Sequence, residues 1–85
     1  MKNVEINEVK VLELLNELKL VLETRHDVSI PELDKLENIV KDKNYTESNI
    51  DKNFSSAFRR VQEIGIYDEN VDGLFRELYD LTLVN

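Results

Sequence analysis

The sequence of 85 residues contains no cysteine and no tryptophan, and only one proline, two glycines and one histidine. Without cysteine, the chain has no disulfide framework, no cysteine-ligated zinc site and no thiol nucleophile. The scarcity of glycine and proline leaves little turn chemistry for a protein built from many short strands. The composition therefore favours helices, in a chain with room for one domain and one modest core.

Basic side chains are also scarce, with 11 Lys and Arg against 18 Asp and Glu, so the formal net charge is −7. This charge disfavours direct binding to nucleic acid or to anionic lipid, where Lys and Arg must meet phosphates. A basic protein partner fits better. The last helical segment has the largest excess of one charge. Its only basic residue is Arg76, and its acidic residues are Asp68, Glu69, Asp72, Glu77 and Asp80. It is either a solvated acidic face or a binding surface.

No apolar stretch is long enough to span a bilayer, and the first apolar stretch is interrupted by acidic residues, unlike a signal peptide. Hydrophobic residues make up 41% of the chain and are spread along its whole length, which is typical of a folded globular protein. We therefore predict a cytoplasmic protein in which residues 1–85 form a single domain.

Apolar residues recur at steps of three and four in four segments, which predicts helices over about residues 3–24, 30–43, 47–64 and 69–83. Short connections between amphipathic helices favour an all-α fold, an antiparallel up-and-down four-helix bundle. The predicted core positions are Val4, Val11, Leu12, Leu14, Leu15, Leu18, Val21, Leu22, Leu33, Leu36, Ile39, Val40, Ile50, Phe54, Ala57, Phe58, Val61, Ile64, Val71, Leu74, Phe75, Leu78 and Leu81.

Capping residues mark the predicted helix ends. Ser29 and Glu32, with Pro31 between them in the first turn, match a capping box that begins the second helix. Gly65 followed by apolar Ile66 is typical of a left-handed C-terminal cap that ends the third helix. The remaining N-cap candidates are Thr46 or Ser48 for the third helix and Asp68 or Asn70 for the fourth.

Residues 68–73, with the sequence DENVDG, resemble the first half of a calcium-binding EF-hand loop. The closing bidentate Glu is missing, because Tyr79 stands at the twelfth position, so a helix-capping segment is the favoured interpretation. His26 is interpreted as a solvated loop residue, and no serine is accompanied by a plausible histidine partner, a nucleophile elbow or an oxyanion glycine. We predict no catalytic residue, no metal site and no cofactor, and hence no enzyme.

The candidate contact surface lies in the C-terminal half. Tyrosine is favoured at interfaces because it offers a rigid surface with a polar tip. Tyr67 and Tyr79 either belong to a contact patch or close the ends of the bundle as partly buried side chains. The candidate partner-binding residues are Tyr67, Asp68, Glu69, Asp72, Arg76 and Tyr79. Arg59 and Arg60 are expected to pair with acidic residues of a neighbouring helix rather than to form a binding patch.

The predicted layout has a long first helix to Thr24, a second through LDKLE at 33–37, a third from Ile50 to Ile64 and a fourth through LFREL at 74–78. This layout resembles that of the enterocin A immunity-type family. Members are small cytosolic four-helix proteins that protect bacteria from their own class IIa, pediocin-like bacteriocins. The resemblance covers nearly the whole chain in length, helix order and apolar spacing. It implies non-enzymatic protection acting on the sugar-uptake permease that serves as bacteriocin receptor, with specificity determinants in the last two helices.

Two functions remain open. The first is an immunity-type or inhibitor-type binding protein, and the second is an acidic inhibitor that mimics nucleic acid, such as a phage-encoded one, and binds a basic protein. The two differ in the salt dependence of binding, which is steep for a mimic of a polyanion. The oligomeric state is also open, because Leu14 and Val21 are either core residues or a dimer contact.

Overall fold

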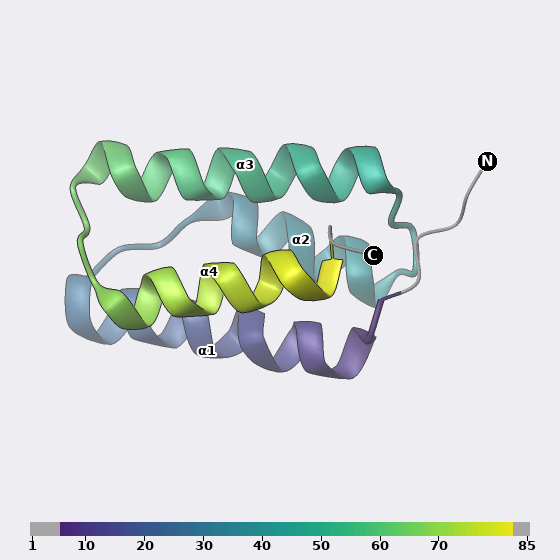
Figure 1. The fold of residues 1–85 in the computed structure, drawn as a ribbon, viewed down its shortest axis with the longest axis horizontal. Helices are drawn as coiled ribbons and strands as arrows, with labels where there is room; N and C mark the ends of the chain where they lie inside the picture. Colours follow the sequence, from purple (N-terminus) through teal and green to yellow (C-terminus); the bar gives the residue numbers. More distant parts are fainter. Residues whose placement is uncertain (1–5, 83–85) are drawn as a thin grey trace.

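A computed structural model describes residues 6–82, which form four helices: α1 (Glu8–His26), α2 (Pro31–Lys41), α3 (Glu47–Ile64) and α4 (Glu69–Thr82). Successive helices run in opposite directions, so the fold is an antiparallel up-and-down bundle (Figure 1). Helix α1 packs most extensively on α4 and α2 on α3, while α3 and α4 make the sparsest contact of the neighbouring pairs. The predicted all-α four-helix fold is confirmed.

Helix α1 begins later and ends later than the sequence predicted. Asn7 caps its start, because the Asn7 Oδ1 atom accepts a hydrogen bond from the Lys10 backbone N–H at 3.2 Å. The helix continues past Thr24 to His26, where Asp27 adopts a left-handed conformation with φ of 53°. Asp is one of the few residues that tolerate this conformation, and our prediction overlooked it as a helix stop. Predicted helical residues 3–5, like residue 83, lie outside the described residues.

The predicted capping box at Ser29 is wrong. The N-cap of α2 is Ile30, which makes no side-chain capping bond, and Pro31 takes the first helical position. Pro31 has no N–H to satisfy and its φ suits the first turn, so this helix start needs less capping. The Glu32 carboxylate is engaged elsewhere, by the Arg60 guanidinium of α3. Helix α2 ends at Lys41, inside the predicted polar run.

Helix α3 has the predicted bounds, and both of its ends follow local chemistry. Thr46 and Asn49 form a capping box, in which each side chain bonds the other residue's backbone N–H. At the other end Gly65 has φ of 89°, a conformation that costs a side-chain-bearing residue energy. The Ile66 N–H donates to the Val61 carbonyl oxygen at 3.2 Å, and the buried Ile66 side chain covers the last turn.

The apolar stripes of all four helices meet in one core. Its largest fully buried side chains are Phe75, Leu15, Leu18, Leu22, Leu33, Ile50, Leu78, Val61 and Val71. Leu14 is buried and Val21 packs partly buried against the core, so the core interpretation holds for both. Ile64 was predicted to be buried but is 49% exposed, because Ile66 occupies the space over the end of the bundle after the Gly65 turn. Ile39, Phe58 and Leu81 are only partly buried.

Among the described helices, none combines the length and the apolar character that crossing a membrane requires.

Candidate functional site

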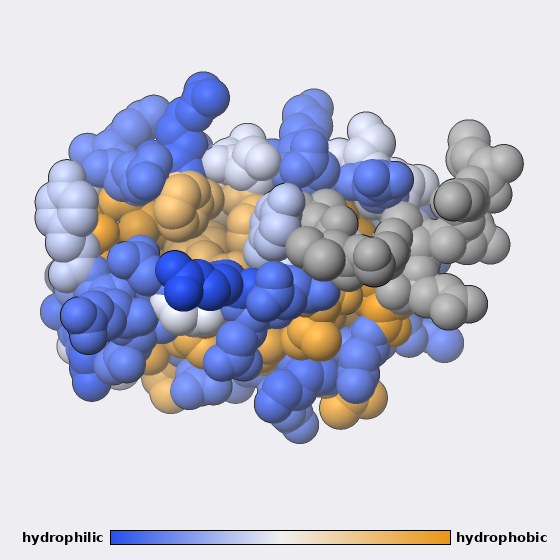
Figure 2. All heavy atoms as spheres, viewed as in Figure 1, coloured by the Kyte–Doolittle hydropathy of each residue, from blue (hydrophilic) through white to orange (hydrophobic). Residues whose placement is uncertain are grey.

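A groove with a volume of about 560 Å³ opens between α3 and α4, the neighbouring helix pair whose backbones approach each other least. The space-filling view shows apolar surface exposed along this seam and polar surface on both sides of it (Figure 2). The groove is lined by Phe54, Ser55, Phe58, Val61, Gln62, Ile66, Tyr67, Asp72, Phe75, Arg76 and Tyr79. Its volume is in the range of ligand-binding clefts, but its openness along two helices suits an elongated ligand.

Aromatic rings form the floor of the groove. Phe54 and Phe58 come from successive turns of α3 and both pack against Phe75 of α4, with ring centroids 5.6 Å and 5.3 Å from that ring. Both pairs meet edge to face, a favourable arrangement for aromatic rings. Tyr79 adds a fourth ring, 5.8 Å from Phe54. All 3 phenylalanines of the sequence therefore meet at this one seam.

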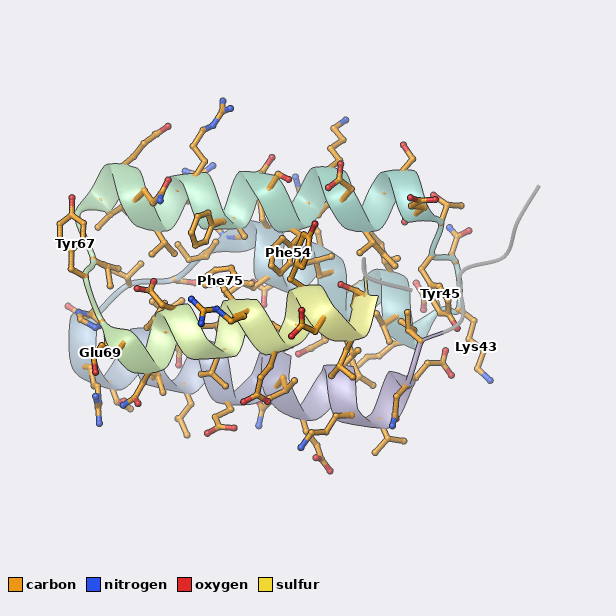
Figure 3. The ribbon with its side chains drawn as sticks, in the orientation of Figure 1. Lys43, Tyr45, Phe54, Tyr67, Glu69 and Phe75 are labelled. Atoms are coloured by element: carbon orange, nitrogen blue, oxygen red, sulfur yellow. The ribbon has the colours of Figure 1, made fainter. Side chains whose placement is uncertain are left out.

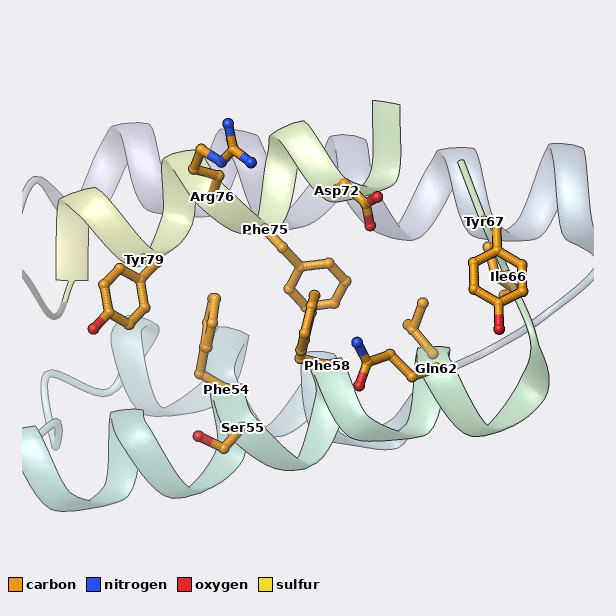
Figure 4. Close-up of a pocket in the computed structure, with 11 residues that line it drawn as sticks. Phe54, Ser55, Phe58, Gln62, Ile66, Tyr67, Asp72, Phe75, Arg76 and Tyr79 are labelled. Atoms are coloured by element: carbon orange, nitrogen blue, oxygen red, sulfur yellow. The ribbon is translucent and has the colours of Figure 1, made fainter. Parts of the chain in front are cut away.

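The two tyrosines mark the ends of the groove (Figure 4). Tyr67, in the connection between α3 and α4, is 89% exposed, and Tyr79 near the end of α4 is 45% exposed. Figure 3 shows Tyr67 extending outward at the end of the bundle opposite Tyr45. Only Tyr45, which is half-buried against the core, fits the alternative of a tyrosine that closes the bundle end.

One turn of α4 supplies two charges to the groove wall. Asp72 and Arg76, spaced four residues apart, are both exposed and both line the groove. No ion pair within residues 6–82 engages either side chain. In the close-up, the Arg76 side chain extends away from α3, which leaves the aromatic floor uncovered (Figure 4).

Asp68 and Glu69 were predicted to belong to the contact surface, but neither lines the groove. Asp68 has a structural role. Its Oδ2 atom lies 2.9 Å from the His26 Nε2 atom and 3.6 Å from Arg25 Nη1, while its Oδ1 atom accepts the Asn70 backbone N–H at 2.9 Å. The His26 hydrogen bond, followed by the bond from Asn70, lowers the pKa of the Asp68 carboxyl.

His26 is therefore not the solvated loop residue that we predicted. It is the last residue of α1 and is half-buried, with its ring nitrogen against Asp68. Sequence reasoning missed this contact because the 2 residues are separated by 42 positions and meet only when α1 and α4 pack together.

The predicted pairing of Arg60 with a neighbouring helix is confirmed. The Arg60 Nε and Nη2 atoms donate hydrogen bonds of 2.9 Å to the two oxygens of Glu32, a bidentate arrangement. This hydrogen bonding lowers the pKa of Glu32, whose carboxyl group is largely buried at the α2–α3 interface. Arg59, the adjacent residue, is exposed and makes no ion pair in the described part of the chain.

The segment that resembles half a calcium loop is helical from Glu69 onward, and Val71 within it is fully buried. Its alternate side chains therefore do not converge on one point, as loop ligands must. Across residues 6–82, no three His, Asp or Glu side chains gather in a way that would hold a metal ion.

The groove wall holds few groups suited to catalysis. Ser55 is its one hydroxyl on α3, and the single histidine of the sequence lies outside the lining. What the groove offers is an aromatic surface with a polar edge, which can accept apolar side chains of a ligand. Sequence reasoning placed Phe54, Phe58 and Phe75 in the core; Phe54 and Phe75 are indeed buried and Phe58 is partly buried against them. It did not predict that the three rings also line a groove. The available signal was the confinement of all phenylalanines to one helix pair.

The structural class is thus a four-helix bundle with an aromatic groove between its last two helices. The chain matches no protein-family model, no curated protein and no solved structure. The resemblance to the immunity-type family therefore stays a prediction from the sequence.

Proposed function

We propose that this chain is a non-enzymatic binding protein that receives an apolar segment of a partner protein in the α3–α4 groove. The observation that carries the proposal is an aromatic seam where Tyr67 and Tyr79 are exposed and Phe58 is partly exposed, packed on the buried rings of Phe54 and Phe75. Exposed aromatic surface with a polar rim is characteristic of protein interfaces. Tyr67, at 89% exposure, makes little contact within its own chain, so a partner is the natural source of contacts for its ring.

The biological form that we propose is immunity-type protection inside the producing cell. Its support is the sequence resemblance, together with the position of the groove on the third and fourth helices, where the resemblance places specificity. In this proposal the groove engages the bacteriocin receptor complex at the cytoplasmic side of the membrane.

The test uses two double variants that each remove two exposed apolar side chains. The groove variant is Tyr67→Ala with Tyr79→Ala, and the α1 control variant is Val9→Ala with Leu20→Ala, at positions 69% and 57% exposed. Each is expressed in a strain that is sensitive to class IIa bacteriocins, and the inhibitory peptide concentration is measured. We expect the wild-type chain and the α1 control variant to raise that concentration and the groove variant to lose the effect.

Two results would overturn the proposal. If the folded wild-type chain gave no protection against the class IIa peptides, the proposal of immunity-type protection would be contradicted. Equal protection by the groove variant, with its helical content unchanged by circular dichroism, would remove the groove as the contact surface.

The acidic mimic is the alternative, and it is supported by the charge of −7 and by the exposed carboxylates of α4, Glu69, Asp72, Glu77 and Asp80. A mimic meets its partner through charges, so its binding would survive loss of the two groove tyrosines and fall steeply with salt. Binding through the groove has the opposite signature, because apolar contacts depend on the tyrosines and are less sensitive to salt.

A further inference from the structure

A second hollow adjoins the groove at Tyr79. It has a volume of about 480 Å³ and is lined by Glu47, Ser48, Asp51 and Tyr79. Tyr79 is thus shared by the aromatic groove and by a polar hollow at the start of α3. A ligand that runs along the groove from Tyr67 past Tyr79 passes from aromatic surface to acidic surface.

Among the described residues that line the second hollow, the two charged ones are both acidic. Glu47 and Asp51 line it from successive turns of α3, both are exposed, and no ion pair in the described chain involves them. Glu47 in the first turn compensates the positive end of the helix dipole, but Asp51, one turn further on, is not needed for that purpose. Lys52 follows Asp51 in sequence but does not line the hollow.

This arrangement also bears on which ligands fit. A second copy of the chain would bring another net charge of −7 and the same acidic hollow, so self-association through this surface is opposed by charge. Acidic peptides and anionic lipids are opposed in the same way. A basic amphipathic segment is complementary at both ends, with apolar side chains over Phe58, Tyr67 and Tyr79 and a cation beside Asp51.

We infer that the partner segment is a cationic amphipathic helix that lies along the α3–α4 groove with its apolar face on the accessible aromatic rings of Phe58, Tyr67 and Tyr79 and its basic end in the Glu47–Asp51 hollow. The inference rests on the proposed function and adds the charge and the direction of the occupant. Apolar contact supplies the affinity, while the hollow selects the charge and the orientation.

The probes are two synthetic helical peptides with the same leucine face, one with lysines clustered at its C-terminal end and one with glutamates there instead. Binding is measured by calorimetry to the wild-type chain, to the hollow variant Glu47→Gln with Asp51→Asn, and to the groove variant. The matched control is Glu77→Gln with Asp80→Asn, which makes the same change in net charge at exposed positions outside both hollows.

We expect the lysine peptide to bind the wild-type chain and the charge control similarly and the hollow variant about threefold to tenfold more weakly, as loss of two exposed ion pairs implies. The groove variant should weaken binding as well. A nitroxide label at the lysine end should broaden the amide resonances of Glu47 and Asp51, and a label at the other end those of Tyr67.

The outcomes separate the two proposals. Equal binding of the lysine and glutamate peptides, or an equal loss in the hollow variant and its charge control, would overturn the cationic assignment and leave the groove standing. Broadening of the Tyr67 region by the label at the lysine end would overturn the orientation. Lysine-peptide affinity that is unchanged in the groove variant would show binding by charge alone and would overturn the proposed function itself.

Discussion

The Nε2 atom of His26 lies 2.9 Å from the Oδ2 atom of Asp68, so the last residue of α1 is joined to the residue immediately before α4. The same carboxylate receives the Asn70 backbone N–H. Asp68 thereby holds one end of the bundle together beside Tyr67, at the mouth of the groove. Because Asp68 follows Tyr67 directly in the sequence, this contact helps to hold Tyr67 at the groove.

The Asp68 contact predicts a contribution to stability that depends on pH. The pKa of Asp68 is lowered from its ordinary value of 3.8, so the folded state favours the ionised carboxylate. Its stabilising contribution is present above pH 3.8 and is lost as the pH falls from there through the lower folded-state pKa. The variant Asp68→Asn keeps a side-chain oxygen that can accept the Asn70 backbone N–H, but it has no carboxyl group to titrate. Its free energy of unfolding should therefore fall less than that of the wild type as the pH drops below 3.8. Urea unfolding at several pH values from 6 to 3 measures the free energy of unfolding of both proteins. An identical dependence of that free energy on pH in the two proteins would contradict the prediction.

The Glu32–Arg60 pair predicts a contrast between two adjacent arginines. Arg60→Ala leaves the largely buried Glu32 carboxylate without its bidentate partner, whereas Arg59→Ala removes an exposed side chain that makes no ion pair in the described structure. Thermal unfolding at pH 7 should show a clearly lower midpoint for Arg60→Ala and a midpoint near wild type for Arg59→Ala. Equal midpoints for the two variants would show that the pair does not stabilise the fold.

The two glycines should respond to alanine in opposite directions. Gly65 has φ of 89°, so Gly65→Ala should destabilise the protein by about 1–2 kcal/mol, the cost of a left-handed conformation for an L-residue. Gly73 lies inside α4 with open space around it, so Gly73→Ala should stabilise the protein by about 0.5–1 kcal/mol. Chemical denaturation gives both values, and effects of the same sign would contradict the assigned conformations.

Two leucines in one helix test the placement of the core. Leu18 is fully buried and Leu20 is 57% exposed. Leu18→Ala should cost about 2–5 kcal/mol through lost burial and the cavity left behind, whereas Leu20→Ala should change the free energy of unfolding by less than about 0.5 kcal/mol. Comparable losses at both positions would mean that α1 presents a different face to the core.

The fold could be predicted from the sequence because local chemistry and apolar spacing agree in most of the chain. Thr46 with Asn49 and Gly65 with Ile66 define α3 without reference to any other helix. The errors occur where a contact with a residue from another part of the sequence determines the local structure. Glu32 matches a capping box in sequence, but Arg60, 28 residues away, provides a stronger, charge-assisted partner at the helix interface. Ile64 fits the apolar stripe, but the turn at Gly65 brings Ile66 over the core instead.

The candidate site could be predicted only in part for the same reason. Tyr67, Asp72, Arg76 and Tyr79 were chosen by residue type and do line one groove. The core positions of Phe54, Phe58 and Phe75 were predicted, but the groove that they line was not, because the spacing of a phenylalanine shows which helix face it occupies and not how closely the facing helix approaches. The wider backbone separation of α3 and α4, compared with the other neighbouring pairs, is a property of the assembled bundle.

The central claim, that the α3–α4 groove is the binding surface, is tested most directly by mapping amide chemical shifts of the labelled chain during titration with the lysine-bearing amphipathic peptide. The account predicts that perturbed resonances cluster in residues 47–67 of α3 and its following turn and in residues 72–79 of α4, with α1 and α2 little affected. Perturbations centred on α1 and α2, or spread evenly over the bundle, would contradict it.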